Sequence, residues 1–455
     1  MTSLPFYVVT LSHPTWEEAL ACAVTLDSEV LPEVRLDLFP ELDPERLVDS
    51  LKGRCLVTCR RKGEGGRWEG SEPDRIAFLA RALEARPLWL DLEWELDVPG
   101  EFLPKLTRTR LLRSVHVQDG VFDLEERLRS LPRGDAYKWV GRASRLSDNA
   151  CLRPHLAWAR DRGIALSAFL MGPKGIPSRA LQSAWGGSFT YAAPDDGPAA
   201  APGQVALGTM RSWRCHRLHL GHGLCGVLGS PVLHSRGPAF HNPRFQRAFK
   251  SLIYLPLECG EAGEALDALA SLEILGASIT APLKESLSRE LGLAGPVNTI
   301  WRRGGGDPWS SANTDLRAME RLCKGLEPGP VLILGGGGVA RTCAKFFTDL
   351  GCPVLSCTRS NPVPPREVEA FGPVGVVQAT SRGMDPEDGP PFPEVLEAGL
   401  SGLRWAVEWV YKSETAFLRW ARARNLMIVD GNSLFEAQAE AQNRIFIEHC
   451  GGGGH

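Results

Sequence analysis

Long apolar runs, long basic runs and ordered cysteine motifs are scarce in this chain of 455 residues, and each scarcity excludes a class of protein. No stretch reaches the roughly 18 uninterrupted apolar residues of a membrane helix, so we expect no membrane partner. The net charge of −3 comes without a basic cluster, which argues against a nucleic-acid partner. The opening residues MTSLPFYVVTL lack the charged and then apolar layout of a secretory signal, which predicts a cytoplasmic protein.

The twelve cysteines are scattered along the chain. Several stand inside apolar runs, as Cys55 and Cys59 do in CLVTC, where a cysteine acts as a small buried apolar side chain. One segment, CHRLHLGHGLC, gathers cysteine and histidine, but its spacing differs from the known zinc patterns. Because Cys225 also begins the apolar run CGVLG, we interpret this segment as a linker. We therefore predict reduced thiols and no bound metal.

The first half of the chain alternates short β-prone runs with helix-like stretches of charged and apolar residues. The runs are FYVVTL, EVRLDL, CLVTC, LWLDLE, LLRSVHV, AYKWV, ALSAFL and SFTYAA. Eight strands that alternate with helices are typical of a parallel (β/α)8 barrel. We assign this barrel to residues 1–212.

Unusual polar residues fall on these runs or at their ends, where barrel enzymes collect their chemistry. They are Glu33, Arg35, Arg60, Asp91, Glu93, His116 and Lys138. Alone, a strand-end histidine is usually structural and a lysine is usually solvated surface. Lys138 at the end of an apolar strand, beside His116 on the neighbouring strand, suits Schiff-base chemistry. A desolvated amine is nucleophilic, and an imidazole can move a proton from the adjacent carbon.

Together these motifs resemble the type I 3-dehydroquinate dehydratase family over roughly residues 1–210. The resemblance rests on ExRxD at 33–37, TCRRKGEGG, SVH, the Lys138 strand, MGPKGIPSR and APGQ, in this order. It implies that Lys138 is the Schiff-base lysine and His116 the general acid and base. It also implies that the substrate is held by Glu33, Arg35, Arg60, Arg179 and Gln204. Two positions depart from the family pattern, since Ala200 replaces a serine and VQDG follows the strand of His116.

The second half carries three polar groups, each next to a predicted strand end. They are Lys284 in ITAPLKE, Asn298 in GPVNTIW and Asp315 in ANTDLRAM. A nucleotide motif follows directly, in which the apolar strand VLIL runs through a glycine-rich turn into a helix. Backbone amides of such a turn bind a pyrophosphate. The order suggests a small polar substrate held against a nicotinamide.

The strand after this motif, CPVLSC, ends in Thr358, Arg359 and Ser360. An acidic residue at this place grips the ribose 2′-hydroxyl of NAD, whereas an arginine fits the 2′-phosphate of NADP. The sequence therefore predicts NADP(H) as the cofactor. An exposed arginine without this role is the alternative.

The second half resembles shikimate dehydrogenase over roughly residues 222–450. The blocks HSxxPxxHN, TAPLKE, VNT, NTD, QATSRGM, EWVYKSET and DGNSLFEAQAEAQ follow the family order. The resemblance implies a catalytic pair, Lys284 and Asp315. It implies substrate contacts from Ser235, Thr280, Asn298, Tyr411 and Gln438. The cofactor residues that we expect are Gly335, Gly336, Gly337, Gly338, Val339, Ala340, Thr358, Arg359, Ser360, Thr380 and Gly431. Gly237 departs from the family, which has a second serine there.

We expect three domains, namely the barrel, a substrate-binding domain at 222–325 completed by a helix at 432–450, and a Rossmann-type NADP domain at 326–431. The expected activity is dehydration of 3-dehydroquinate followed by NADPH-dependent reduction of 3-dehydroshikimate to shikimate, a layout similar to the fused enzyme of plants. One alternative is an aldolase-like Schiff-base barrel fused to a quinate dehydrogenase. Another is a sensor that kept these folds and lost the chemistry, although all four expected catalytic residues are present. The tail GGGGH carries no structural signal.

Overall fold

The computed structural model describes residues 4–117, 123–293, 297–385, 387–397, 400–411 and 414–451. It divides into two compact units, Met1–Leu275 with Gly451–His455, and Gly276–Cys450. The division into three domains stays a prediction. Of the features singled out in the sequence, most of VQDG and most of the tail GGGGH lie outside the described residues.

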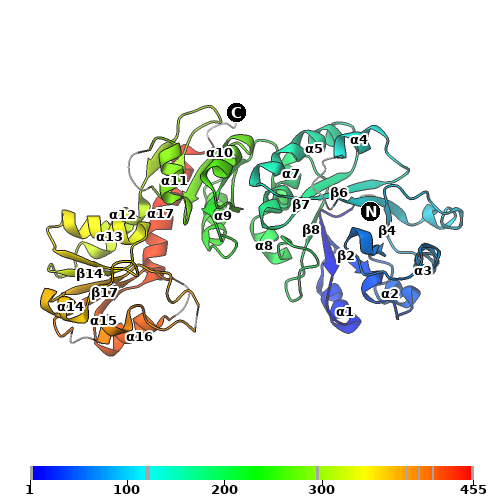
Figure 1. The fold of residues 1–455 in the computed structure, drawn as a ribbon. Helices are drawn as coiled ribbons and strands as arrows, with labels where there is room; N and C mark the ends of the chain where they lie inside the picture. The colour runs from blue at the N-terminus through cyan, green and yellow to red at the C-terminus, as the bar shows by residue number, and fades with distance from the viewer. Residues whose placement is uncertain are drawn as a thin grey trace. The chain divides into compact units, whose positions relative to one another are not determined.

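The first unit contains the predicted eight-stranded parallel barrel, coloured blue to teal in Figure 1. Its strands are β1 (Tyr7–Leu11), β2 (Val30–Arg35), β3 (Leu56–Thr58), β4 (Trp89–Glu93), β5 (Arg110–His116), β6 (Ala136–Arg142), β7 (Leu166–Met171) and β8 (Thr190–Ala192). They pair in the order β7-β6-β5-β4-β3-β2-β1-β8. A hydrogen bond of 2.9 Å from the Ser188 amide to the Leu166 carbonyl links the chain just before β8 to β7, so the barrel is nearly closed.

The connections of the barrel are α-helices and short 3-10 turns. The α-helices are α1 (Trp16–Thr25), α2 (Pro44–Ser50), α3 (Glu72–Glu84), α4 (Leu124–Arg129), α5 (Leu152–Asp161), α6 (Ile176–Ala180), α7 (Gln182–Trp185) and α8 (Leu207–Ser212). The 3-10 turns are η1 (Leu36–Leu38), η2 (Lys62–Glu64), η3 (Gly100–Phe102), η4 (Lys105–Thr107), η5 (Leu146–Cys151), η6 (Pro173–Gly175) and η7 (Cys215–Arg217). The sequence signals are local, as in α1, where Thr15 and Glu18 form a capping box.

Two apolar layers hold the barrel together. Strand residues such as Val8, Leu31 and Leu112 fill the interior, and the opposite strand faces pack against the helices, for example at Val34 and Leu79. Successive side chains of a strand point to opposite faces of the sheet, so each strand contributes to both layers. The polar residues predicted at strand ends therefore project beyond the packed interior, at one end of the barrel.

Two expectations about strand limits are wrong. The run EVRLDL was expected to be a strand throughout, but β2 ends at Arg35 and Leu36–Leu38 form the turn η1. The turn places the Asp37 carboxylate against the Arg35 guanidinium in two hydrogen bonds of 2.8 and 2.7 Å. Lys138 does not end its strand, because β6 continues to Arg142 and its lysine is flanked by β5 and β7.

The first unit continues beyond the barrel with β9 (Gly223–Gly229), α9 (Gly237–Arg247), β10 (Leu252–Glu258) and α10 (Ala262–Ser271). β9 and β10 pair in parallel. Cys225 is buried within β9, as expected from the run CGVLG.

The second unit has a small antiparallel part and a parallel sheet. The antiparallel part comprises β11 (Ile274–Ile279), which belongs to this unit from Gly276 onward, β12 (Thr299–Trp301) and β13 (Ser310–Ala312). The parallel sheet comprises β14 (Val331–Leu334), β15 (Val354–Cys357), β16 (Gly375–Gln378), β17 (Trp405–Glu408) and β18 (Met427–Val429). Its order is β15-β14-β16-β17-β18, which is a Rossmann-type arrangement.

Helices cover both faces of this sheet, and Figure 1 shows α13 on one face and α15 and α16 on the other. The helices of the unit are α11 (Leu283–Glu290), α12 (Thr314–Cys323), α13 (Gly338–Asp349), α14 (Pro365–Phe371), α15 (Pro393–Glu397), α16 (Ala416–Ala423) and α17 (Gly431–His449). The long helix α17, red in Figure 1, packs along α12. Asn313 and Asp430 cap α12 and α17 with their side chains. Among the described residues, no helix has both the length and the apolar character to cross a membrane.

Candidate active sites

Lys138 is the buried centre of the first site. Its Nζ lies 2.9 Å from Asp91 Oδ2, 3.1 Å from the Tyr191 hydroxyl and 3.9 Å from Glu33 Oε1. Burial lowers the pKa of Lys138, although the Asp91 carboxylate opposes this shift. The amine is thus held in place by an anion while it is easier to deprotonate than an exposed lysine.

His116, the last residue of β5, lies beside Arg60. The Arg60 guanidinium contacts His116 Nδ1 and forms ion pairs with Asp91 at 2.9 Å and Glu64 at 3.0 Å. Burial lowers the pKa of His116 well below its ordinary value, and the cations of Arg60 and Lys138 lower it further. The lowered pKa keeps the imidazole neutral, which is the form that a general base requires.

Glu33 and Asp91 supply the buried carboxylates beside the Lys138 amine. Glu33 accepts hydrogen bonds from Thr10 at 2.7 Å and Thr58 at 2.8 Å. Asp91 accepts from Ser114, Arg60 and Lys138. Burial would raise the pKa of Asp91, but the charges of Lys138 and Arg60 outweigh it and hold the pKa below the ordinary value. Asp91 is thus a charged bridge between the two cations.

Arg179 in α6 carries buried donors that no described residue satisfies. It is 1 % exposed, and its Nε and Nη1 have no hydrogen-bond partner within the described part of the chain. Its Cζ lies 4.3 Å from the centre of the Phe169 ring. Burial lowers the pKa of Arg179 to about 9. An anion that entered this site would supply the missing acceptors, which suits a substrate carboxylate.

Every predicted residue of the first site borders one cavity of about 210 Å³. The predicted residues on its wall are Glu33, Arg35, Arg60, His116, Lys138, Arg179 and Gln204. Gln204 accepts from the Ala200 amide at 2.8 Å, so the position that departs from the family pattern contributes its backbone here. Two important neighbours were missed in role, namely Asp91, which the sequence placed only at a strand end, and Tyr191 in SFTYAA. A tyrosine in the last predicted strand is the signal that could have indicated Tyr191.

The second site joins Lys284, the second residue of α11, to Asp315, the second residue of α12. Lys284 Nζ lies 2.7 Å from Asp315 Oδ2, and Asn298 Nδ2 donates to Asp315 Oδ1 at 2.8 Å. The side-chain Oδ1 of Asn298 accepts in turn from the Thr314 backbone amide at 2.7 Å. Three residues predicted from separate motifs therefore form one hydrogen-bonded chain, in which the amide and the lysine fix the carboxylate from both sides.

The remaining predicted substrate residues are less closely connected. Thr280 follows β11 and its carbonyl accepts from the Leu283 amide at 2.9 Å, which starts α11. Gln438 in α17 lies 3.4 Å from the Thr314 hydroxyl, so it reaches the Asn298 cluster. The Tyr411 ring packs on Phe435 at 4.9 Å between centroids. Ser235 belongs to the first unit, where its Oγ accepts from the Gly237 amide at 3.1 Å.

Gly237 has a steric reason to lack a side chain. A Cβ at this position would lie 2.8 Å from the ring of Tyr254, which is buried in β10. The hydroxyl that the family carries here would therefore require the ring to move. The sequence comparison with the family pattern could not anticipate this, because Tyr254 lies on another element.

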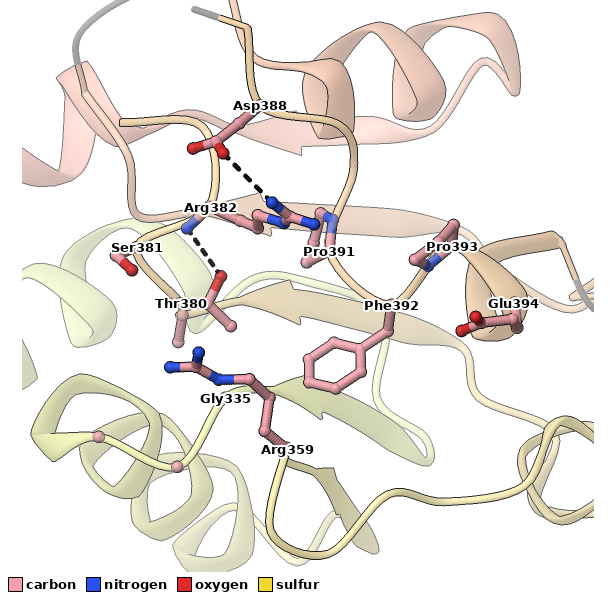
Figure 2. A pocket seen from close by; sticks show the side chains of 13 residues that line it. Gly335, Arg359, Thr380, Ser381, Arg382, Asp388, Pro391, Phe392, Pro393 and Glu394 are labelled. Atoms are coloured by element: carbon pink, nitrogen blue, oxygen red, sulfur yellow. Dashed lines mark hydrogen bonds and ion pairs between the residues drawn. The ribbon is translucent and has the colours of Figure 1, made fainter. Parts of the chain in front are cut away.

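The glycine-rich turn between β14 and α13 forms part of a second cavity, of about 680 Å³ (Figure 2). Gly335 has φ 131°, and a Cβ there would lie 2.7 Å from the Ala379 carbonyl oxygen, so a side chain is excluded. A Cβ at Gly338 would lie 3.4 Å from Lys284 Cδ. The turn therefore brings the Lys284 side chain next to the start of the predicted cofactor helix.

Arg359 points into this cavity, near Thr380 and Phe392 in Figure 2. The predicted cofactor residues that line the cavity are Gly335, Gly336, Gly337, Arg359 and Thr380. The predicted residues that do not line it are Gly338, Val339, Ala340, Thr358, Ser360 and Gly431. Arg382 also lines it and pairs with Asp388 at 3.3 Å. Arg382 was not predicted to contact the cofactor, although it stands in the block QATSRGM.

Comparison with known proteins gives two family matches. Residues 7–214 match the family described as type I 3-dehydroquinase, and residues 227–300 match the shikimate dehydrogenase substrate binding domain. The 3-dehydroquinate dehydratase of Desulfotalea psychrophila is 32 % identical over 214 residues, which covers 45 % of this chain and 94 % of that protein.

Two relatives span both halves. The chloroplastic bifunctional 3-dehydroquinate dehydratase/shikimate dehydrogenase of Arabidopsis thaliana is 26 % identical over 473 residues, covering 91 % of this chain and 77 % of that protein. The solved structure of the dehydroquinate dehydratase and shikimate dehydrogenase from S. pombe AroM is 21 % identical with a TM-score of 0.40, and the match covers 98 % of this chain and 96 % of that one.

Proposed function

The chain belongs to the type I 3-dehydroquinase family through its barrel and continues into a match to the shikimate dehydrogenase substrate binding domain, and on this premise we propose that it converts 3-dehydroquinate to shikimate in two steps. The first step forms 3-dehydroshikimate and the second reduces it. The observation that carries the proposal is the buried Lys138 amine among Asp91, Tyr191 and Glu33, in a cavity that also holds His116 and unpaired donors of Arg179.

In the dehydration, the neutral Lys138 amine attacks the ketone to form a carbinolamine, and the hydroxyl group of this intermediate takes up a proton and leaves as water, which gives a protonated imine. His116 then takes a proton from the carbon beside the imine, and the resulting enamine expels the hydroxyl group, which is protonated as it leaves. Hydrolysis of the conjugated imine releases the enone and restores Lys138. The lowered pKa values of Lys138 and His116 support these roles, because both groups must be neutral to act.

The same cavity accounts for recognition of a carboxylated polyol. Arg179 and Gln204 are proposed to hold the carboxylate, since Arg179 presents buried donors and stands on a short helix beside the cavity. Glu33, Arg35 and Arg60 are proposed to hold ring hydroxyls. Arg35 is fixed by Asp37, and Arg60 by Asp91 and Glu64, so both guanidinium groups keep their position before substrate enters.

In the reduction, Lys284 is proposed to donate a proton to the alkoxide as it develops, while Asp315 orients the ammonium. The contact of 2.7 Å between them and the support from Asn298 suit this division of work. The residues present fit a dinucleotide, because a glycine turn, a helix start and an arginine border one cavity. When bound, the nicotinamide supplies the hydride.

The proposed cofactor is NADP(H). Arg359 and Arg382 both border the cavity. Arg359 follows the end of β15, which is the place where this fold binds the adenosine ribose of the cofactor. The site residues Thr358 and Ser360 flank Arg359, and their hydroxyls lie 3.2 Å apart. Two guanidinium groups favour the extra phosphate.

The direct test supplies the purified full chain with 3-dehydroquinate and NADPH and follows enone absorbance and NADPH loss together. We expect NADPH loss to begin only as the enone forms. Enone formation with no NADPH loss would remove the second step, and binding without either change would indicate a sensor. Replacing the substrates by quinate and NADP⁺ tests the alternative dehydrogenase, since faster oxidation of quinate than of shikimate would overturn the proposed product.

A further inference from the structure

A cluster of possible metal ligands lies in the barrel outside the proposed catalytic cavity. His13 follows β1, Cys22 stands in α1 and Asp196 stands in the segment between β8 and α8. One ligand atom from each lies within 4.8 Å of the other two. In a tetrahedral zinc site the ligand atoms are separated by about 3.3 to 3.8 Å. A small shift of the side chains would therefore bring the three atoms around one ion.

The imidazole of His13 is the second, independent observation. It is 7 % exposed, and neither ring nitrogen makes a hydrogen bond to any described residue. Its Nε2 lies 3.4 Å from Asp196 Oδ1. A buried polar group without a partner costs free energy, so such groups are normally satisfied by an atom or an ion. A metal bound to Nε2 would satisfy the ring nitrogen that lies beside Asp196.

Gly197 covers the ring of His13, whereas the Asp196 side chain is open to solvent. A Cβ at Gly197 would lie 2.5 Å from His13 Nε2, so the chain passes directly over the ring and only glycine fits there. The Asp196 side chain is 70 % exposed, whereas His13 and Cys22 are buried. Solvent can therefore reach the carboxylate side, which would give the ion a water molecule as its fourth ligand and a path for entry.

We propose that His13, Cys22 and Asp196 form a binding site for a zinc-class divalent cation that fastens the segment 193–206 to the first strand and first helix of the barrel. A thiolate, an imidazole and a carboxylate are ligands that Zn²⁺ takes together, with water in the fourth position. Binding breaks the Cys22 S–H bond, forms the metal–sulfur bond and releases one proton to solvent. Because the segment also carries Ala200 and Gln204, the ion would limit the movement of residues that border the catalytic cavity.

Cobalt and zinc titrations of the metal-free full chain test the site. We expect one Co²⁺ per chain, with a thiolate-to-cobalt absorption band that Zn²⁺ abolishes. Cys22→Ser should remove the band, and Asp196→Asn should weaken binding by at least the 10- to 100-fold typical of losing even an outer contact of a metal site. Zn²⁺ should also raise the unfolding temperature of the parent and not of Cys22→Ser.

Matched controls separate this site from other thiols and imidazoles. Cys151→Ser removes an exposed cysteine, and His222→Gln removes one of the two neighbouring histidines of the rejected CHRLHLGHGLC segment. Both variants should keep the band. Absence of a band in the parent, a band that survives Cys22→Ser, or a band lost in His222→Gln would overturn the proposal. Asp196→Asn keeps the test decisive if Cys22→Ser fails to fold, because its side chain is largely exposed.

Discussion

Individual charges in the barrel set the reactivity of Lys138. Its pKa is lowered by burial and raised by Asp91, and the two effects compete at a distance of 2.9 Å between the amine and the carboxylate. The net direction is downward, so burial is the stronger influence. This balance makes Asp91 a positioning residue that keeps the amine in place and opposes the lowering of its pKa by burial.

Asp91→Asn should therefore shift the pH dependence of imine formation to lower pH. Removal of the anion lowers the pKa of Lys138 further, so the neutral amine is populated at lower pH. The rate of inactivation by borohydride with 3-dehydroquinate, measured against pH, reports this shift. The variant also leaves Arg60 and Lys138 buried without their shared carboxylate, at a cost of about 3–5 kcal/mol in stability. The exposed Asp49→Asn is the control, and an unchanged or higher midpoint would contradict the assignment.

Lys284 and Asp315 should act as a unit. Lys284→Ala is expected to lower dehydrogenase kcat by about 10²- to 10⁴-fold with little change in KM, since the ammonium acts on charge that develops in the transition state. Asp315→Asn should behave similarly, and the double variant should fall little below either single variant. Steady-state kinetics of shikimate oxidation by the parent, both single variants and the double variant measures this coupling. Fully additive losses would show that the two residues work separately.

Arg359 should determine the choice of cofactor. A guanidinium on the 2′-phosphate is worth about 1.5–3 kcal/mol, or roughly ten- to a hundredfold in affinity. Arg359→Ala should therefore erase most of the preference for NADP and leave NAD-linked activity nearly unchanged. Arg366→Ala, an exposed arginine in α14, is the control. A parent that uses NAD equally well would mean that Arg359 does not read the phosphate.

At the scale of elements, buried carboxyl groups connect strands to the segments that follow them. Glu408, the last residue of β17, is fully buried and accepts from the Val410 amide at 2.9 Å and the Thr415 hydroxyl at 2.7 Å. Burial raises the pKa of Glu408 to about 7, and both hydrogen bonds oppose this shift. The carboxyl group thus links the end of β17 to the start of α16.

The raised pKa predicts that β17 loses stability as pH rises. The folded state binds the Glu408 proton more tightly than the unfolded state does, so its contribution is complete below pH 4.5 and is lost as pH passes through about 7. The expected loss is about 3 kcal/mol. Hydrogen exchange of the β17 amides between pH 5 and 8, corrected for intrinsic rates, should show this slope in the parent and not in Glu408→Gln. The exposed Glu414→Gln should keep it, and an equal slope in Glu408→Gln would contradict the assignment.

At the scale of the whole molecule, the proposed catalytic residues of the two sites belong to different compact units. Lys138 and its cavity lie in the first unit, and Lys284, Asp315 and the glycine turn lie in the second. No residue of the proposed imine chemistry takes part in the proposed reduction. The two activities should therefore be separable by chemistry that acts on one lysine.

Borohydride added with 3-dehydroquinate should attach ligand mass to Lys138 and abolish dehydration only, because reduction of the imine is irreversible. Lys138→Ala should lose dehydration and keep shikimate oxidation. Mass spectrometry of peptides locates the adduct, and the exposed Lys62→Ala serves as the control. An adduct on another lysine, or loss of both activities in a folded Lys138→Ala protein, would contradict the assignment of two independent sites.

The sequence by itself determined the features that depend on local order. Alternating strands and helices predicted the barrel, and strand, glycine turn and helix predicted the Rossmann sheet, because residues close in sequence set these patterns. Family motifs also indicated the candidate residues of the first cavity. The limits of strands were less certain, as Lys138 and the run after Arg35 show, since pairing with neighbouring strands fixes where a strand ends.

Only the tertiary structure decided which distant side chains meet. Asp91 and Tyr191 reach Lys138 from β4 and β8, and Tyr254 explains the glycine at 237 from another element. The cluster of His13, Cys22 and Asp196 has no recognisable spacing in sequence. Its residues meet because β1, the first strand of the barrel, pairs with β8, the last one. Contacts of this kind depend on closure of the sheet, and local sequence patterns do not record it.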